Sequence, residues 1–215
     1  MTKILLVDDH DLVRAGLKSI LESNAELTVI SEHDSGEKAI EFLAAADQMP
    51  DVVMMDLNMP GMGGMEATKR ISHKYPDIKI IVVTALQDNP FPAQLFKLGA
   101  SGYVTKGCDA AEMFTAIQTV MQGKQYLASE IADKQPKQSA EDIGEEQNPF
   151  GKLSDREMQI MLMVTQGMSN QFISDSLFLS PKTISTYRHR LFEKLDISND
   201  VELTHLAIRY GVINQ

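Results

Sequence analysis

The sequence contains a single cysteine, Cys108, and no tryptophan. One cysteine cannot form a disulfide within the chain, which suits a reducing compartment, and we expect a cytoplasmic protein. The five histidines show no zinc-ligand spacing with Cys108 or with one another. No apolar run approaches the roughly 20 residues that span a bilayer, and residues 4–7 are too few for a signal peptide, so we expect no membrane insertion.

Basic residues are too few to balance the acidic ones, and the formal net charge of −10 lies entirely in residues 1–150. Such a balance argues against a protein that coats nucleic acid indiscriminately. Residues 151–215 are net neutral, however, and residues 181–195 contain four basic residues and only one acidic residue. A basic helix on a neutral domain can still reach DNA.

Short apolar runs alternate with helical periodicity through the first 122 residues. This rhythm predicts strands at 4–7, 27–30, 52–55, 79–84 and 102–105, each followed by a helix. Five such units are typical of the α/β class, with a doubly wound, five-stranded parallel sheet of the flavodoxin-like kind. We therefore assign residues 1–124 to one domain.

Polar side chains stand where four of these strands end. Residues 52–55 are wholly apolar, as in a strand buried on both faces, and run into Asp56. The other three runs end at Asp8 and Asp9, at Thr84, and at Lys106. A single aspartate after a strand is usually a turn former. Because parallel strands end at one edge of a sheet, where ligands bind, the whole set predicts a site.

The chemistry of this set points to phosphoryl transfer. Clustered carboxylates bind a hard cation such as Mg²⁺, which also holds phosphate oxygens. A metal ion, an ammonium group and a hydroxyl together neutralise charge on a transferred phosphoryl group. Asp56 has no base beside it in sequence, so it reads as a nucleophile that becomes phosphorylated itself.

With Asp8, Asp9, Asp56, Thr84 and Lys106 in this order and spacing, residues 1–122 resemble a response-regulator receiver domain. The resemblance implies Asp56 as the phosphoacceptor, Thr84 and Lys106 as phosphoryl contacts, and Thr84 with Tyr103 as a conformational switch. It also implies Mg²⁺ on Asp8, Asp9, Asp56 and the backbone carbonyl of Asn58. Many receivers carry proline after the active-site lysine, in a cis peptide. Gly107 stands there in this chain, where a cis bond would cost about 2.5–4 kcal/mol, so the isomer is left open.

The remainder of the chain reads as a linker and an all-α domain. Polar residues without periodicity predict a linker at 125–149. Over residues 150–215 we expect four helices, the first opened by a Ser154–Glu157 capping box and the last capped by Asp200. Two short helices joined by a tight turn, the second of them basic, indicate a helix-turn-helix.

One face of the third of these helices is the candidate DNA-binding surface. Residues 150–212, with their Leu-Ser-Pro-Lys-Thr-Ile turn, resemble the NarL/FixJ (LuxR-type) helix-turn-helix, which implies a homodimer on double-stranded DNA with inverted-repeat sites. We expect base contacts from Ser185, Thr186 and His189, and phosphate contacts from Lys182, Thr183, Tyr187 and Arg190. The resemblance places Val201, Thr204 and His205 near the partner subunit.

Finer stretches, among them residues 89–92 and 186–195, resemble the GacA/UvrY/SirA/VarA group of regulators. That likeness implies a hybrid sensor histidine kinase of the BarA/GacS type as phosphodonor. It further implies transcription, with RNA polymerase, of small regulatory RNA genes in the Csr/Rsm pathway. We expect no enzymatic activity beyond Mg²⁺-dependent gain and loss of the protein's own aspartyl phosphate.

Three other functions stay open at this point. A phosphohydrolase with an aspartyl nucleophile often carries a second aspartate two residues on, where this chain has Asn58. Against a LuxR-type regulator whose first domain binds a small ligand, the acidic strand ends argue that this domain holds no apolar ligand pocket. A receiver that acts only through protein contacts would show no salt-sensitive DNA binding.

Overall fold

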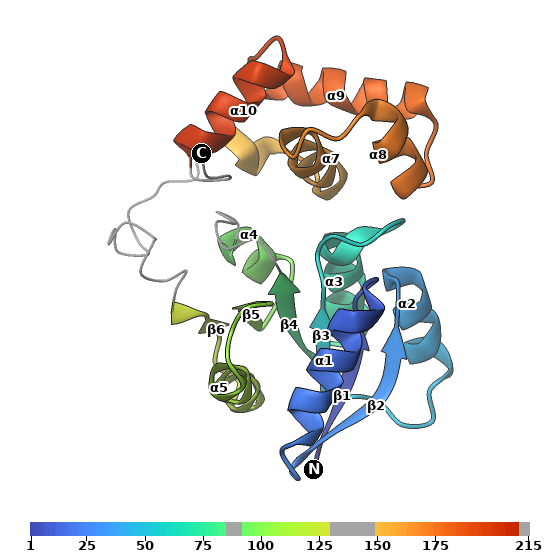
Figure 1. Cartoon of the computed structure of the whole chain (residues 1–215), viewed down its shortest axis with the longest axis vertical. Coiled ribbons are helices and arrows are strands. Elements are labelled where there is room, and N and C mark those ends of the chain that lie inside the picture. The colour runs from blue at the N-terminus through green and yellow to red at the C-terminus, as the bar shows by residue number, and fades with distance from the viewer. Residues whose placement is uncertain (85–91, 130–148, 211–215) are drawn as a thin grey trace. The chain divides into compact units, whose positions relative to one another are not determined.

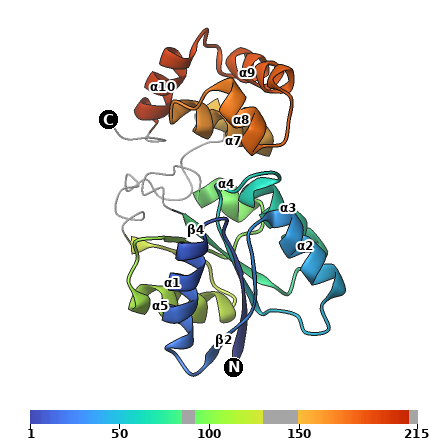
Figure 2. The same ribbon diagram turned by 45° about the vertical axis from the view of Figure 1, so that its right-hand side comes forward.

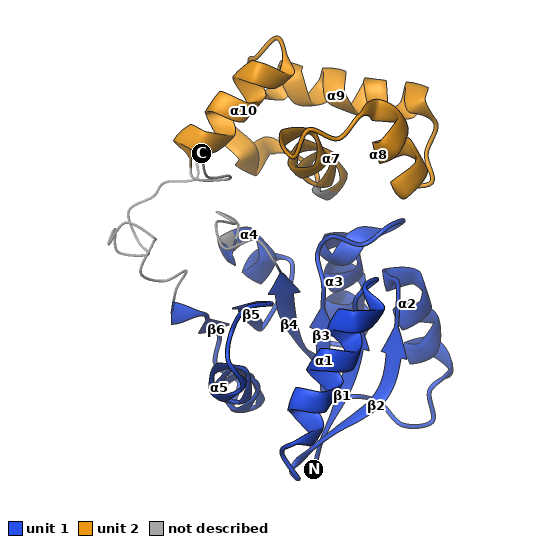
Figure 3. Cartoon of the chain, in the orientation of Figure 1, with its two compact units in different colours: residues 1–87, 92–132 blue, residues 88–91, 133–215 orange. Residues whose placement is uncertain are grey.

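A computed structural model of the chain describes residues 1–84, 92–129 and 149–210, without the side chains of Ala93 and Asp155. These residues form two compact units, an α/β unit before the linker region and a helical unit after it (Figure 3). None of the helices in these three ranges is long and apolar enough to cross a membrane.

The α/β unit is built on one parallel sheet (Figure 1). Its strands are β1 (Thr2–Val7), β2 (Leu27–His33), β3 (Val52–Met55), β4 (Lys79–Thr84), β5 (Gly102–Thr105) and β6 (Tyr126–Leu127). They follow the order β2-β1-β3-β4-β5-β6. From β1 the chain adds β2 on one side and then crosses to add β3 on the other side. The order of strands therefore reverses between β1 and β3, and open α/β sheets bind ligands at such a switch point.

Helices cover both faces of the sheet (Figure 2). They are α1 (Asp11–Glu22), α2 (Gly36–Ala45), α3 (Gly63–Lys74), α4 (Pro92–Lys97) and α5 (Ala110–Met121). Alternate residues of β1 point to opposite faces: Ile4 and Leu6 pack with α1 and α5, whereas Leu5 and Val7 pack with α2 and α3. All four residues of β3 are buried, as expected of a central strand between two helical layers.

The predicted fold class is confirmed, but the sheet has six strands rather than five. The extra strand, β6, is two residues long and pairs in parallel with β5 through Gly102 and Tyr103. Glu112 of α5 holds this segment, because its Oε1 accepts from the Tyr126 hydroxyl at 3.2 Å and from the Ser129 backbone N–H at 3.2 Å. A two-residue strand leaves no periodic signal, which is why sequence patterns placed these residues in a linker.

The helical unit begins with a 3-10 turn, η1 (Pro149–Lys152), followed by α7 (Asp155–Thr165), α8 (Asn170–Ser176), α9 (Pro181–Leu195) and α10 (Asp200–Arg209). The predicted capping box is present, with the backbone N–H of Ser154 donating to Glu157 at 2.7 Å. The cap of α10 is Asn199 rather than Asp200, because the Asn199 side chain accepts from the Glu202 backbone N–H at 3.0 Å.

Candidate functional site

The register of the sheet brings the first two predicted site residues together. Val7 of β1 lies opposite Met55 of β3, so Asp8 and Asp56 leave the sheet side by side. The backbone N–H of Asp56 also donates to the Val7 carbonyl at 2.8 Å. Because the strands are parallel, both carboxylates lie at the carboxyl edge.

Lys106 joins these two acids from the end of β5. Its Nζ lies 2.6 Å from Asp8 Oδ2 and 3.1 Å from Asp56 Oδ2. Both carboxylate side chains are almost fully buried, with 3% and 2% of their surface exposed, and the lysine side chain is 16% exposed. One ammonium group therefore serves two buried carboxylates, which leaves the group with an excess of negative charge.

The pKa values of the cluster reflect this crowding. Burial raises the pKa of the Asp56 carboxyl, Asp8 adds to the rise, and Lys106 opposes it without cancelling it. Burial lowers the pKa of the Lys106 ammonium, but its ion pairs with Asp8 and Asp56 outweigh that effect and the net pKa is raised. The lysine is therefore held in its charged form.

Asp9 and His10 complete the acidic group. His10 Nδ1 lies 2.9 Å from Asp9 Oδ1 and 3.2 Å from Asp8 Oδ1. One ligand atom from each of Asp8, Asp9, His10 and Asp56 lies within 4.8 Å of the others. Sequence reasoning missed His10, whose single position after two acids carries no ligand-like spacing.

The buried oxygens of this group fit a hard divalent cation. From the residues that the structure describes, Asp8 Oδ2, Asp9 Oδ1 and Asp56 Oδ2 receive no hydrogen bond beyond their ion pairs with Lys106 and His10. Buried carboxylate oxygens are costly without further partners, and oxygen-rich sites of this kind suit Mg²⁺. The donor set therefore supports the expected cofactor.

Backbone close to Asp56 shapes the site further. The Asn58 backbone, close to the Asp56 carboxylate, partly opposes the rise in the pKa of Asp56. A Cβ added to Gly64 would lie 1.9 Å from the Asp56 carbonyl oxygen, and the Gly64 N–H donates to the Leu57 carbonyl at 3.0 Å. Only glycine lets α3 begin this close to the end of β3. Sequence reasoning missed Gly64, because a glycine within a predicted helix gives no sign of what it approaches.

The predicted switch residues lie in the interior of the unit. Thr84, at the end of β4, and Tyr103, in β5, are fully buried. The Thr84 carbonyl accepts from the Lys106 backbone N–H at 2.8 Å, which ties the ends of these two strands. The Lys106–Gly107 peptide bond is trans, as are all peptide bonds in the described residues. Residues 89–91, part of the stretch 89–92 used for the finer resemblance, lie outside the described residues.

In the helical unit, α8 and α9 form the expected helix-turn-helix. Ser180 caps α9 by accepting from the Thr183 N–H at 3.0 Å, Pro181 is its first residue, and Ile184, Leu191 and Leu195 are its buried face. The opposite face carries the predicted DNA contacts. Lys182, Ser185, Thr186, His189 and Arg190 are exposed, and Thr183 and Tyr187 are half-buried.

Two of the four basic side chains of α9 do not lie on that face. Arg188 forms an ion pair with Asp200, and Lys194 Nζ lies 2.6 Å from Oε2 of the buried Glu157. The unpaired positive charge of α9 is thus smaller than the sequence count implies, and among the described residues it comes from Lys182 and Arg190.

Comparison with known families identifies the domain to which each of the two units belongs. A family described as "Response regulator receiver domain" matches residues 4–118, and one described as "Bacterial regulatory proteins, luxR family" matches residues 151–207. The chain belongs to the LuxR-type response regulators.

Similar proteins are found at full length. The chain is 48% identical to "Response regulator UvrY" of Escherichia coli over 214 residues, covering 100% of this chain and 97% of that protein. It is 47% identical to "Response regulator GacA" of Pseudomonas syringae pv. syringae, covering 100% and 99%. The predicted likeness to the GacA/UvrY group is therefore confirmed.

A solved structure is also similar to this response regulator. RcsB from Salmonella enterica serovar Typhimurium, bound to a promoter in the presence of the phosphomimetic BeF3⁻, is 25% identical. The match has a TM-score of 0.67 and covers 95% of this chain and 97% of that one.

The predicted dimer contacts of this response regulator lie on α10. Val201 has 64% of its surface exposed, an unusual fraction for a valine, and His205 is also exposed. Thr204 is half-buried, and its hydroxyl donates to the Asp200 carbonyl at 2.8 Å. Two of the three side chains are thus open to a partner.

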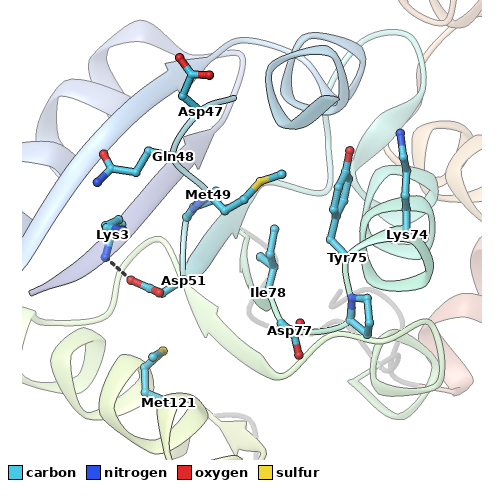
Figure 4. A pocket seen from close by; sticks show the side chains of 12 residues that line it. Lys3, Asp47, Gln48, Met49, Asp51, Lys74, Tyr75, Asp77, Ile78 and Met121 are labelled. Carbon is cyan, nitrogen blue, oxygen red and sulfur yellow. Dashed lines mark hydrogen bonds between the residues drawn. The ribbon is translucent and has the colours of Figure 1, made fainter. Parts of the chain in front are cut away.

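A hollow of about 760 Å³ lies at the other edge of the receiver sheet (Figure 4). It is lined by residues that precede β3 and β4, with Met49 extending toward Ile78. The backbone N–H of Lys3 donates to Asp51 Oδ2 at 2.7 Å along its wall. The amino ends of the strands form this hollow, so it takes no part in the acidic site.

Proposed function

We propose that this response regulator accepts a phosphoryl group on Asp56 from a sensor histidine kinase and then regulates transcription as a DNA-binding dimer. The observation that carries the proposal is the buried cluster of Asp56, Asp8 and Lys106 at the switch point of the sheet. Among the residues of the cluster, Asp56 is the carboxylate that follows the central strand.

The chemical step follows from the positions of these groups. An Asp56 carboxylate oxygen forms a bond to phosphorus while the bond between phosphorus and the kinase histidine nitrogen breaks, and the imidazole leaves with that electron pair. Lys106 is placed to bond the transferred phosphoryl oxygens, and we assign the Thr84 hydroxyl the same role. Asp8, Asp9, Asp56 and the Asn58 carbonyl would hold Mg²⁺. When bound, Mg²⁺ supplies positive charge that neutralises the phosphoryl oxygens.

Phosphorylation adds to the excess of negative charge that surrounds Lys106. A phosphoryl group on Asp56 adds negative charge beside an ammonium that is shared with Asp8. We assign the response to the buried Thr84 and Tyr103: Thr84 moves toward the phosphoryl group, and Tyr103 occupies the space that it vacates. This is a two-state switch that a local charge biases.

The output is sequence-specific DNA binding. Support comes from the exposed face of α9 and from the similar RcsB structure, which is bound to a promoter. Ser185, Thr186 and His189 read base edges, and Lys182, Thr183, Tyr187 and Arg190 hold phosphates. Two copies pair through Val201, Thr204 and His205 on inverted repeats, so that effective concentration strengthens the second contact.

The finer biological role rests on likeness to the UvrY and GacA regulators. We assign the phosphodonor to a hybrid kinase of the BarA/GacS type. The targets are small regulatory RNA genes of the Csr/Rsm pathway, transcribed by RNA polymerase in the cytoplasm. Within the chain, residues 1–124 are the receiver, 125–149 the linker and 150–215 the DNA-binding domain.

The proposal is tested by DNA binding with and without phosphorylation. A duplex from the promoter of such a small RNA gene is titrated with wild-type protein, Asp56→Asn and Asp47→Asn, each with and without acetyl phosphate and Mg²⁺. Asp47 is an exposed acid at the other edge of the sheet and is the matched control. We expect phosphorylation to tighten binding of wild type and Asp47→Asn only. Equal binding by all forms would overturn phosphorylation control and leave DNA binding standing.

A further inference from the structure

Arg188 projects from the recognition helix α9 into the helical unit. Its side chain is only 18% exposed, and its Nη1 donates to Asn170 Oδ1 of α8 at 2.5 Å. Its Nη2 forms a hydrogen-bonded ion pair with Asp200 of α10. The guanidinium carbon also lies 6.0 Å from the centre of the Phe192 ring. One side chain thus ties three helices together.

On the α8 side, this contact reaches a predicted base-reading residue. An asparagine amide has an accepting oxygen and a donating nitrogen. Because Arg188 takes the oxygen of Asn170, the nitrogen is turned toward Ser185, and Nδ2 donates to Ser185 Oγ at 3.4 Å. Ser185 Oγ in turn donates to the Pro181 carbonyl at 3.0 Å. The orientation of the Ser185 hydroxyl therefore depends on Arg188.

On the α10 side, the contact reaches the predicted dimer helix. Asp200 is the first residue of α10 and directly precedes Val201. An ion pair between Arg188 and Asp200 fixes the start of α10 against the middle of α9. In a dimer on an inverted repeat, the separation of the two recognition helices follows from how each is held against the dimer contact.

We propose that Arg188 is a positioning residue that sets the spacing of the two DNA half-sites and the base contact of Ser185. This inference rests on the proposed function, because it uses the DNA-reading and dimer faces assigned there. Arginine suits the role, since its planar fork can donate to two acceptors at once, whereas lysine is a single point charge on a flexible stem.

Arg190 provides the matched comparison. It is exposed and forms no ion pair or side-chain hydrogen bond with the residues the structure describes. Replacing Arg188 or Arg190 by glutamine removes the same charge from the same helix. Only the Arg188→Gln change breaks contacts to α8 and α10.

The first measurement is the salt dependence of binding to duplex DNA by the full-length protein. The slope of log affinity against log salt is negative, and each phosphate contact steepens it by about 0.9. We expect Arg190→Gln to make the slope shallower by about that amount and Arg188→Gln to leave the slope unchanged. An equal fall in both variants would make Arg188 a phosphate contact and overturn the inference.

The second measurement is selection from a randomised duplex DNA library, in the presence of acetyl phosphate and Mg²⁺. Wild-type protein and Arg190→Gln should select inverted repeats with one dominant half-site spacing. Arg188→Gln should select the same half-site with a broadened range of spacings and weaker preference at the base that Ser185 reads. Asp200→Asn should broaden the spacing alone, and Asn170→Ala should weaken the base preference alone. Thermal melting identifies any variant that fails to fold, and Arg188→Lys then replaces Arg188→Gln.

The outcomes separate this inference from the proposed function. One unchanged spacing in the folded Arg188 and Asp200 variants would overturn the inference while DNA recognition stands. If wild-type protein selects no sequence at all, the proposed function fails, and the inference fails with it.

Discussion

The receiver site and the recognition helix use charged side chains in opposite ways. At the receiver site, Asp8 and Asp56 are buried and share one ammonium group 2.6 and 3.1 Å away. On α9, Lys182 and Arg190 point to solvent. Buried charges interact strongly with whatever enters the site, whereas exposed charges are screened and rearrange freely. The first arrangement suits a switch that a single phosphoryl group must bias, and the second suits a surface that meets a polyanion.

The recognition helix also has a buried side, which narrows the contrast. Arg188 is largely buried and Lys194 is partly exposed, and both are paired within the helical unit, where they hold α9 against α7, α8 and α10. A basic side chain on a helix is thus either structural or available to DNA, and its partners decide which. The following changes test that division, in order of expected effect on stability.

Lys106→Gln should have the largest effect. It leaves two buried carboxylates facing each other, and removing one partner of a buried pair costs about 3–5 kcal/mol. Urea unfolding at neutral pH measures the loss, and added Mg²⁺ should restore part of it, because a ligand of the folded state stabilises that state. Lys38→Gln, which breaks the exposed pair with Asp34, is the control and should cost at most about 1 kcal/mol. Equal losses in the two variants would contradict the contrast.

Gly64→Ala tests the backbone that supports Asp56. The added methyl group meets the Asp56 carbonyl, so the start of α3 must shift, at a cost of about 1–3 kcal/mol. The control is Gly16→Ala in α1, where a Cβ meets no atom within 4 Å and should stabilise the helix by about 0.5–1 kcal/mol. Phosphorylation by acetyl phosphate should slow in the first variant only. A Gly64→Ala protein as stable as wild type would show that the close approach is not needed.

Glu157→Gln tests the buried acid of the helical unit. Burial raises the pKa of Glu157, but Lys194 and the Ser154 cap outweigh it and the net pKa is lowered. A lowered carboxyl pKa stabilises the fold above the unfolded value of about 4.5, and this stability is lost as pH falls through the folded pKa. The variant should lose about 1–2 kcal/mol at neutral pH and less in acid. The pH dependence of stability from Asp56 has the opposite sign. Its raised pKa stabilises the fold at low pH, and this stability is lost as pH rises through the folded pKa.

Glu193→Gln is the control for that measurement, because Glu193 is exposed and lies 3.5 Å from His189 on the surface of α9. Its difference from wild type should stay near zero across the same pH range. A parallel response of the two glutamate variants would mean that the Glu157 contacts do not stabilise the fold.

Tyr126→Phe tests the sixth strand. The hydroxyl donates to Glu112, and burial together with that carboxylate raises the pKa of Tyr126 to about 12. The hydroxyl stabilises the fold at neutral pH, and this stability is lost as pH rises through about 12. Only wild-type protein should therefore lose stability over that pH range. We expect a loss of about 0.5–1.5 kcal/mol and faster amide exchange at residues 126–129. Unchanged amide exchange at residues 126–129 would show that the Tyr126 hydroxyl does not stabilise the pairing of β6.

Lys182→Gln should have the smallest effect on stability, within about 0.5 kcal/mol, because the side chain is exposed. Its effect on DNA should nevertheless be clear, with the salt slope of binding falling by about 0.9. A stability change as large as that of Glu157→Gln would place Lys182 among the structural side chains instead.

The receiver site could be predicted from sequence to an unusual degree, for a physical reason. Parallel strands end at one edge of a sheet, so the side chains of Asp8, Asp56 and Lys106 meet there regardless of the conformation of the loops. Contacts that depend on close approach could not be predicted in this way. Gly64 and His10 became visible only when the backbone placed them beside the acids.

For the helical unit, sequence patterns predicted the helices and the exposed face of α9 but not the use of its charges. Arg188 and Arg190 are alike in sequence, and only the neighbours Asn170 and Asp200 separate them. By itself, then, the sequence determined the doubly wound fold, the helix-turn-helix and the strand-end acids, because periodicity and strand ends are local. Tertiary structure alone decided the sixth strand, the approach of Gly64 and the inward turn of Arg188, because each depends on a partner outside its own helix or strand.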